Sequence, residues 1–145
     1  MEVDRNGLEV LDRAECLRLL DRATLGRIGV TSGALPAVFP VNFLLNGDQI
    51  LLLTAEGSKL DAATRNAVVA FEADDFDPMY HSGWSVLVTG VAREITDSDE
   101  LAALRHAPLA RWAHNGVERL MAISADMISG RRIVPGLDRN QKAPR

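Results

Sequence analysis

Short stretches in which apolar residues recur at every second position predict β-strands in the first half of the chain. Residues 26–32 show this alternation, and extended apolar stretches follow at residues 37–45 and 50–54. Pro40 cannot donate a ladder hydrogen bond, so its stretch is expected at a sheet edge or bulge. The intervening Asn46-Gly47-Asp48 favours a hairpin, because Asn-Gly tolerates the positive φ angles of a tight turn. The pattern predicts a three-stranded meander.

Three further strands are predicted in the second half. Residues 68–73 resume the β pattern, and residues 84–95 form a long stretch rich in β-branched residues. Gly90 interrupts this stretch where a barrel strand would bend or bulge. Residues 118–124 are interpreted as the last strand, with apolar residues on both faces. The acidic residues 74–78 between two of these strands are expected to form a loop.

Short helices are expected at the connections. Residues 11–20 read as an amphipathic helix with Asp12 as its N-cap, and Gly26 is taken to mark its end. A second helix is expected at residues 57–65 and a third beginning at Ser98. Six short strands with small helices between them predict a mostly β protein, an antiparallel barrel with α-helical additions.

Composition and charge exclude some classes of function from what we expect of this protein. The 145 residues are 47% hydrophobic and 25% charged, and the formal net charge of -4 offers no broad positive field for nucleic acid. Residues 1–134 are expected to form one domain and residues 135–145 a polar tail. Cys16 is the only cysteine, and no apolar run approaches the ~20 residues of a membrane span. We therefore expect a cytoplasmic protein that binds neither membrane nor nucleic acid.

No metal site is predicted. The three histidines, His81, His106 and His114, are scattered without cysteine or carboxylate partners at ligand spacing. The acidic residues 74–77 lack the spacing of a twelve-residue calcium loop. A solvated loop is the better interpretation of that run.

One cluster offers binding chemistry. Thr54 ends a predicted strand, and Ser58 and Lys59 begin the next helix. Two hydroxyl donors and an ammonium group could together bind a phosphate. The alternative is ordinary capping by Ser58 beside a solvated lysine, which is common at helix starts.

Several short motifs, taken in order and spacing over about residues 11–133, resemble the small pyridoxamine 5'-phosphate oxidase-like proteins. They are Pro40-Val41-Asn42-Phe43, Asn46-Gly47-Asp48, Thr54, Gly57-Ser58-Lys59, Phe71-Glu72, Gly83-Trp84-Ser85-Val86-Leu87-Val88 with Gly90, and Ser129-Gly130-Arg131-Arg132. The resemblance implies a six-stranded split β-barrel. It also implies a homodimer that binds flavin mononucleotide (FMN) at the subunit interface.

The resemblance assigns roles to individual residues. The flavin ring would lie along Pro40, Val41, Asn42 and Phe43, and its phosphate would meet Thr54, Ser58 and Lys59. Trp84 and Ser85 match a strand start that reaches the cofactor of the other subunit, and Arg131 matches a position that approaches the flavin. The residues alone leave alternatives open, because Trp84 also fits a half-buried barrel aromatic and Arg131 a surface ion pair.

The implied function is an FMN-dependent oxidoreductase acting on a small molecule. A deazaflavin-dependent reductase is an alternative, because Arg27, Arg65, Arg131 and Arg132 could supply the extra cations that its acidic coenzyme needs. A second alternative is a non-catalytic flavin- or haem-binding protein, with His81 or His114 as haem ligand. In pyridoxamine phosphate oxidases proper, a C-terminal Arg and His pair binds the phosphate of the substrate. The tail of this chain lacks that histidine, so oxidation of vitamin B6 is not expected.

Overall fold

The structure, a computed structural model, describes residues 1–104, 107–109, 117–133 and 135. In this part of the chain three helices and nine strands follow one another as β1 (Glu9–Leu11), α1 (Arg13–Arg22), β2 (Leu25–Ser32), β3 (Leu35–Asn42), β4 (Leu44–Asn46), β5 (Gln49–Ala55), α2 (Lys59–Thr64), β6 (Val68–Asp77), β7 (Ser82–Glu94), α3 (Ser98–Ala103), β8 (Glu118–Ser124) and β9 (Met127–Ile133). The predicted class, mostly antiparallel β with small helices, is confirmed. None of these helices is long and apolar enough to cross a membrane.

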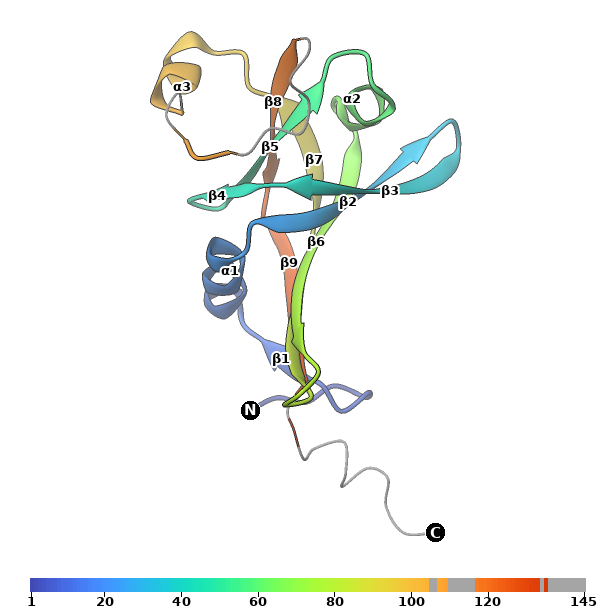
Figure 1. The fold of residues 1–145 in the computed structure, drawn as a ribbon, viewed down its shortest axis with the longest axis vertical. Helices are drawn as coiled ribbons and strands as arrows, with labels where there is room; N and C mark the ends of the chain where they lie inside the picture. The colour runs from blue at the N-terminus through green and yellow to red at the C-terminus, as the bar shows by residue number, and fades with distance from the viewer. Residues whose placement is uncertain (105–106, 110–116, 134, 136–145) are drawn as a thin grey trace.

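One antiparallel sheet curls around the core. Its strand order is β3-β2-β6-β7-β8-β5-β4, with β9 paired to β7 and β1 to β9 (Figure 1). The two ends of this path, β3 and β4, are consecutive in the chain and separated only by Phe43. They are not paired with each other, so the barrel stays open between them. Pro40 lies in the edge strand β3, as predicted.

Strand β7 passes from one half of the sheet to the other. Its first part pairs with β6 and β9, and its last residues, Ala92–Glu94, pair with β8. Gly90 lies at the crossing, where an added Cβ would come 2.8 Å from the backbone oxygen of Ser124. A close approach of two backbones therefore accounts for the glycine here, and the bend expected at Gly90 stays a prediction.

The helices begin where local chemistry predicts. The Asp12 carboxylate accepts a hydrogen bond from the Glu15 N–H at 2.9 Å and caps α1, and Ser58 caps α2. One prediction is wrong, because α1 ends at Arg22 and Gly26 belongs to β2. The ring of Phe71 packs directly on Gly26, so this glycine serves a close contact inside the sheet and not a helix end.

Two further expectations about strands are corrected. The acidic run predicted as a loop continues β6 as far as Asp77, because Asp74–Asp77 pair with Ser82–Ser85 of β7. Residues 118–124 are not the last strand, since β9 follows and pairs with β7 on one side and β1 on the other. The core inside the sheet contains large side chains with no exposed surface, among them Phe71, Leu20, Ile28, Leu52 and Met121.

Candidate functional site

A groove of about 260 Å³ lies where β3, β5 and α2 meet. We call it the β3–α2 groove. Its lining comprises Phe39, Pro40, Val41, Asn42, Leu53, Ala55, Ser58, Lys59, Leu60 and Glu118. One wall is largely apolar and comes from the strands, and the start of α2 supplies a hydroxyl and an ammonium group.

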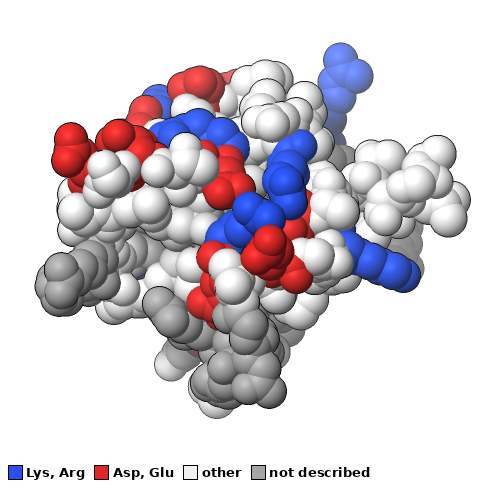
Figure 2. Space-filling view, turned by 90° about the horizontal axis from the view of Figure 1, so that it is seen from above, with Lys and Arg blue, Asp and Glu red and all other residues white. Residues whose placement is uncertain are grey.

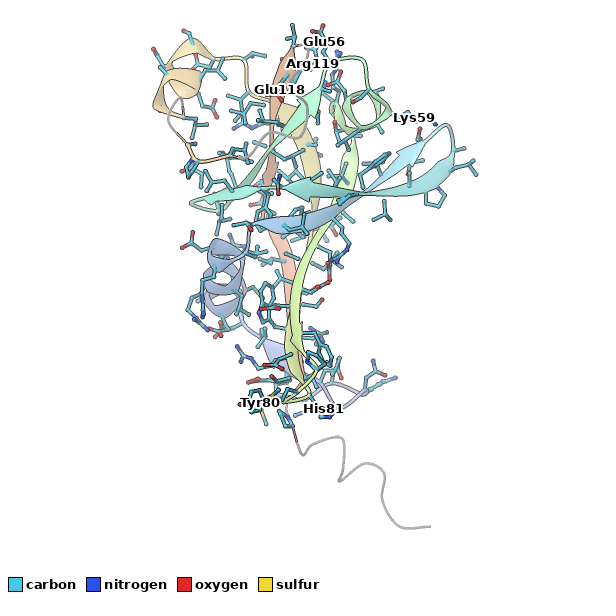
Figure 3. All side chains as sticks on the ribbon, in the orientation of Figure 1. Glu56, Lys59, Tyr80, His81, Glu118 and Arg119 are labelled. Atoms are coloured by element: carbon cyan, nitrogen blue, oxygen red, sulfur yellow. The ribbon has the colours of Figure 1, made fainter. Side chains whose placement is uncertain are left out.

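The turn between β5 and α2 places Lys59 at the groove. Gly57 has φ +81°, in the left-handed region that favours glycine. Ser58 then caps α2 by accepting a hydrogen bond from the Asp61 N–H at 3.0 Å. Lys59 is exposed, and no salt bridge involves it among the described residues. Its side chain lies on the side of α2 toward the β2–β3 hairpin (Figure 3).

Five of the residues assigned by resemblance come together in this groove. Pro40, Val41 and Asn42 contribute from β3, and Ser58 and Lys59 from the start of α2. Up to 19 positions of sequence separate them, so only the fold gathers them. A planar apolar group would match the apolar wall, and an anionic tail would match the end at which Lys59 lies, although Glu118 also lines the groove.

Two other assigned residues point into the core. The Thr54 side chain is buried, and its hydroxyl donates to the Asp61 carboxylate at 3.0 Å. Phe43 is 3% exposed and packs edge-to-face on Phe71, with 4.7 Å between ring centroids. This geometry does not support direct donation from Thr54 to a phosphate, because the Thr54 hydroxyl donates its hydrogen bond to a buried carboxylate.

The remaining assigned residues lie outside the groove. Ser85 and Arg131 are directly opposite each other on β7 and β9, whereas Trp84 is opposite Arg132. Successive strand residues point to opposite faces, so Trp84 and Ser85 cannot contact one ligand from the same side. Arg131 pairs with Asp4 at 2.8 Å. Within one chain these residues do not join the β3–α2 groove.

Sequence reasoning missed the carboxylate beneath the groove. Asp61 is 1% exposed and accepts hydrogen bonds from Thr54 and from the Gly57 N–H, the latter at 3.0 Å. Burial by itself would raise the pKa of Asp61. The hydrogen bonds from Gly57 and Thr54 and the charges of Arg65 and Arg119 outweigh burial and hold this pKa below its ordinary value of 3.8. The Ser58-x-x-Asp61 spacing, which resembles a capping box, was the available signal.

Charges of both signs are interleaved at the end of the molecule that is at the top of Figure 1 and faces the viewer in Figure 2. Arg119 of β8 donates to Asp61 at 3.3 Å, to Glu94 at 3.0 Å and to Glu56 at 2.9 Å. Glu56, Glu118 and Arg119 lie together at the top of the molecule in Figure 3, and Tyr80 and His81 lie at the opposite end. The described residues contain no group of three potential metal ligands, and His106 and His114 lie outside them.

A second cluster of charges occupies the outer face of the sheet. Arg27 pairs with Glu72 at 3.1 Å and with Asp74 at 3.0 Å. Burial raises the pKa of Glu72 to about 7, with the hydrogen bond and charge of Asp74 adding to the effect and Arg27 opposing it. The folded protein therefore binds a proton at Glu72 more tightly than the unfolded chain does.

This cluster predicts a pH dependence of stability. Between about pH 4.5 and pH 7, folded Glu72 holds a proton that the unfolded chain has released, so the free energy of unfolding falls as pH rises through this window. Denaturant titrations of wild type and Glu72→Gln at several pH values would measure it. The wild type should lose stability relative to the variant up to about pH 7 and then level off. Parallel curves would contradict the assignment.

The chain is similar to proteins of a known family. The family profile described as pyridoxamine 5'-phosphate oxidase matches residues 12–132. An uncharacterized protein of Mycobacterium tuberculosis is 39% identical over 129 residues, covering 86% of this chain and 84% of that protein. The structure of an FAD binding protein from Mycobacterium smegmatis has 39% identity and a TM-score of 0.74, over 86% of this chain and 97% of that one. A candidate pyridoxamine 5'-phosphate oxidase from Corynebacterium glutamicum has 32% identity and a TM-score of 0.77, over 89% and 95%.

Proposed function

The chain belongs to the pyridoxamine 5'-phosphate oxidase family, and on that premise we propose that it binds a flavin nucleotide in the β3–α2 groove and acts as an oxidoreductase. The observation that carries this proposal is the gathering of Pro40, Val41, Asn42, Ser58 and Lys59 in one groove. A relative of 39% identity is described as an FAD binding protein, which supports a flavin over other cofactors.

The residues of the groove would have distinct tasks. The backbone of Val41 and Asn42 would lie along the ring, and Leu53 and Leu60 would keep water from it. The Lys59 ammonium and the Ser58 hydroxyl would bind the phosphate nearest the ring. A bound flavin supplies the hydride or electron chemistry, so the protein's part is to position the ring and shield it.

FMN and FAD share the ring and the first phosphate, so the groove accounts for the part common to both. The deazaflavin alternative is less well supported, because it calls for further cations near the groove. Arg27, Arg65, Arg131 and Arg132 do not line the groove, and each of them pairs with a carboxylate. Titration with FMN, FAD, riboflavin and a deazaflavin coenzyme would rank the four ligands.

Lys59→Ala tests the phosphate contact. A charge-assisted hydrogen bond contributes roughly 1.5–3 kcal/mol, so FMN affinity should fall about 10- to 150-fold while riboflavin affinity is nearly unchanged. Fluorescence titration of purified protein measures both dissociation constants. Arg93→Ala is the matched control, because it removes one cation that pairs with Glu100 and does not line the groove.

Two outcomes would count against these assignments. If wild-type protein binds no flavin, the proposed function is wrong. If Lys59→Ala weakens FMN and riboflavin equally, Lys59 is not at the phosphate. Anaerobic reduction of the bound flavin by reduced nicotinamide or another donor would support the oxidoreductase, and binding without reduction by any donor would favour a flavin carrier.

We also propose that the chain works as a homodimer. Apolar side chains gather on the outer face of the sheet, which we define by Val38, Val68, Leu87, Val91 and Met127; these side chains are 42% to 68% exposed. Strand register places Val38, Gly29, Ala70, Thr89 and Met127 in one row across this face. An exposed apolar row bordered by charged side chains, here the cluster of Arg27, Glu72 and Asp74, is typical of a protein interface.

The groove itself supports a second subunit. Ligand pockets usually measure roughly 300–1,000 Å³, and the β3–α2 groove is smaller than that. The barrel interior is filled by side chains, so a tricyclic ring can only lie outside it. A second copy of the chain would complete the cover over the ring. Ser85 and Arg131 lie on the outer face of the sheet, where such a copy would pack.

Sedimentation should show a dimer at micromolar concentration. Val38→Glu places a carboxylate next to Glu72 and Asp74 in the hollow they share with Val38, so we expect it to yield a folded monomer. Val117→Glu is the control, since Val117 is equally exposed but lies outside the sheet. A monomeric wild type would contradict the dimer.

A further inference from the structure

The buried carboxylate of Asp61 joins both ends of the turn that carries Lys59. Its Oδ2 atom accepts the Gly57 N–H at 3.0 Å, and its own backbone N–H donates to the Ser58 hydroxyl oxygen at 3.0 Å. Lys59 lies within this closed segment, between Ser58 and Asp61. The direction in which the Lys59 side chain leaves the turn is therefore coupled to the position of Asp61.

Asp61 is in turn fixed from two neighbouring strands and from its own helix. The Thr54 hydroxyl of β5 donates to Oδ1 at 3.0 Å, and the Arg119 Nε of β8 donates to Oδ2 at 3.3 Å. Arg65, one helical turn away, approaches Oδ2 at 3.5 Å. Four donors thus surround a carboxylate whose residue is 1% exposed, and these contacts hold it in place inside the protein.

Asp61 nevertheless stays out of the groove. Ser58, Lys59 and Leu60 line the groove, and Asp61 does not. Its carboxylate faces inward, away from any ligand there. An effect of Asp61 on a ligand would have to act through the turn.

We propose that Asp61 is the positioning residue of the β3–α2 groove. It holds Ser58 and Lys59 in the orientation that meets a phosphate, and so sets the preference for phosphorylated flavin over riboflavin. This inference rests on the proposed function, because it concerns the same groove. Arg119 and Thr54 contribute by holding Asp61 in place.

The test replaces Asp61 with asparagine in the wild type and in Lys59→Ala. The amide keeps the size of the side chain but has one acceptor oxygen for four donors, so Gly57 or Arg119 loses its partner. Asp61→Asn should weaken FMN at least tenfold and riboflavin less than threefold. In the Lys59→Ala background the further FMN-specific loss should be smaller than in the wild type, because only the Ser58 contact is left to be positioned.

Thr54→Val provides a second variant if Asp61→Asn does not fold, as judged by circular dichroism. It removes one hydrogen bond to the carboxylate and keeps the shape of the side chain. We expect a smaller loss of the FMN preference, and Thr54→Ser, which restores a hydroxyl, should recover it. A change in stability alone would leave the ratio of the two affinities unaltered.

The outcomes separate the two proposals. A wild type that prefers FMN and an Asp61→Asn protein with the same preference would overturn the role of Asp61 and leave the flavin groove standing. Equal losses of FMN and riboflavin, or an FMN-specific loss in the Lys59→Ala background as large as in the wild type, would also overturn it. A wild type that binds neither ligand would overturn the proposed function and this inference with it.

Discussion

Replacing Arg119 with alanine is expected to lower the free energy of unfolding by clearly more than the loss of an exposed ion pair does. Its guanidinium joins Asp61, Glu94 and Glu56 through three hydrogen bonds of 2.9 to 3.3 Å. Without it, the buried charge of Asp61 keeps only Arg65 as a cation, at 3.5 Å. An uncompensated buried charge costs roughly 3–5 kcal/mol. The loss should stay below that range, because Asp61 keeps Arg65 and the hydrogen bonds from Thr54 and Gly57. Urea denaturation measures the change.

Arg93→Ala is the matched control for this prediction. Arg93 is also an arginine in a strand, but its pair with Glu100 is exposed, with side chains 44% and 34% accessible. Exposed pairs contribute about 0–1 kcal/mol, so little change is expected. Equal losses in the two variants would show that the Arg119 network does not stabilise the fold beyond an ordinary surface pair.

Phe71→Ala is expected to cost roughly 3–5 kcal/mol, the largest effect of a single core truncation here. Phe71 has no exposed surface, lies in β6 and packs edge-to-face on Phe43. Removing its ring leaves a cavity between sheet strands that cannot collapse without shifting the backbone. Phe76 of the same strand is 53% exposed, and its replacement by alanine should cost much less.

The same ring explains Gly26. A Cβ at Gly26 would lie 2.5 Å from the Phe71 ring and 2.9 Å from the Glu72 backbone oxygen. Gly26→Ala should therefore destabilise the protein, and by less in a Phe71→Leu background, because the ring contact is then relieved. Additive losses in the double variant would show that the ring does not cause the clash.

Local chemistry made much of the fold predictable. The Asn46-Gly47-Asp48 hairpin joins β4 and β5 as expected, with φ +64° at Gly47, and Asp12 and Ser58 cap their helices. Asn46 itself ends β4 and does not take a positive φ. These features depend on a few neighbouring residues, which is why pattern and spacing could reveal them.

The strands that were missed have no such local signal. Residues 127–133 contain Ser129-Gly130-Arg131-Arg132, and they become β9 because β7 and β1 pair on either side. Gly130 allows Cys16 of α1 to pack against this strand, since an added Cβ would lie 2.6 Å from the Cys16 sulfur. Pairing partners far apart in the chain decided the structure of this segment.

The sequence alone determined the β pattern, the caps, the hairpins and, through its motifs, which short segments could form a cofactor groove. Only the tertiary structure decided which side chains reach that groove. The packing of the sheet buries the side chains of Thr54 and Phe43 in the core. It also places Trp84 and Ser85 on opposite faces and brings Arg119 of β8 to Asp61. The reason is that alternation along a strand fixes which neighbours share a face, whereas strand pairing and packing decide which face is buried.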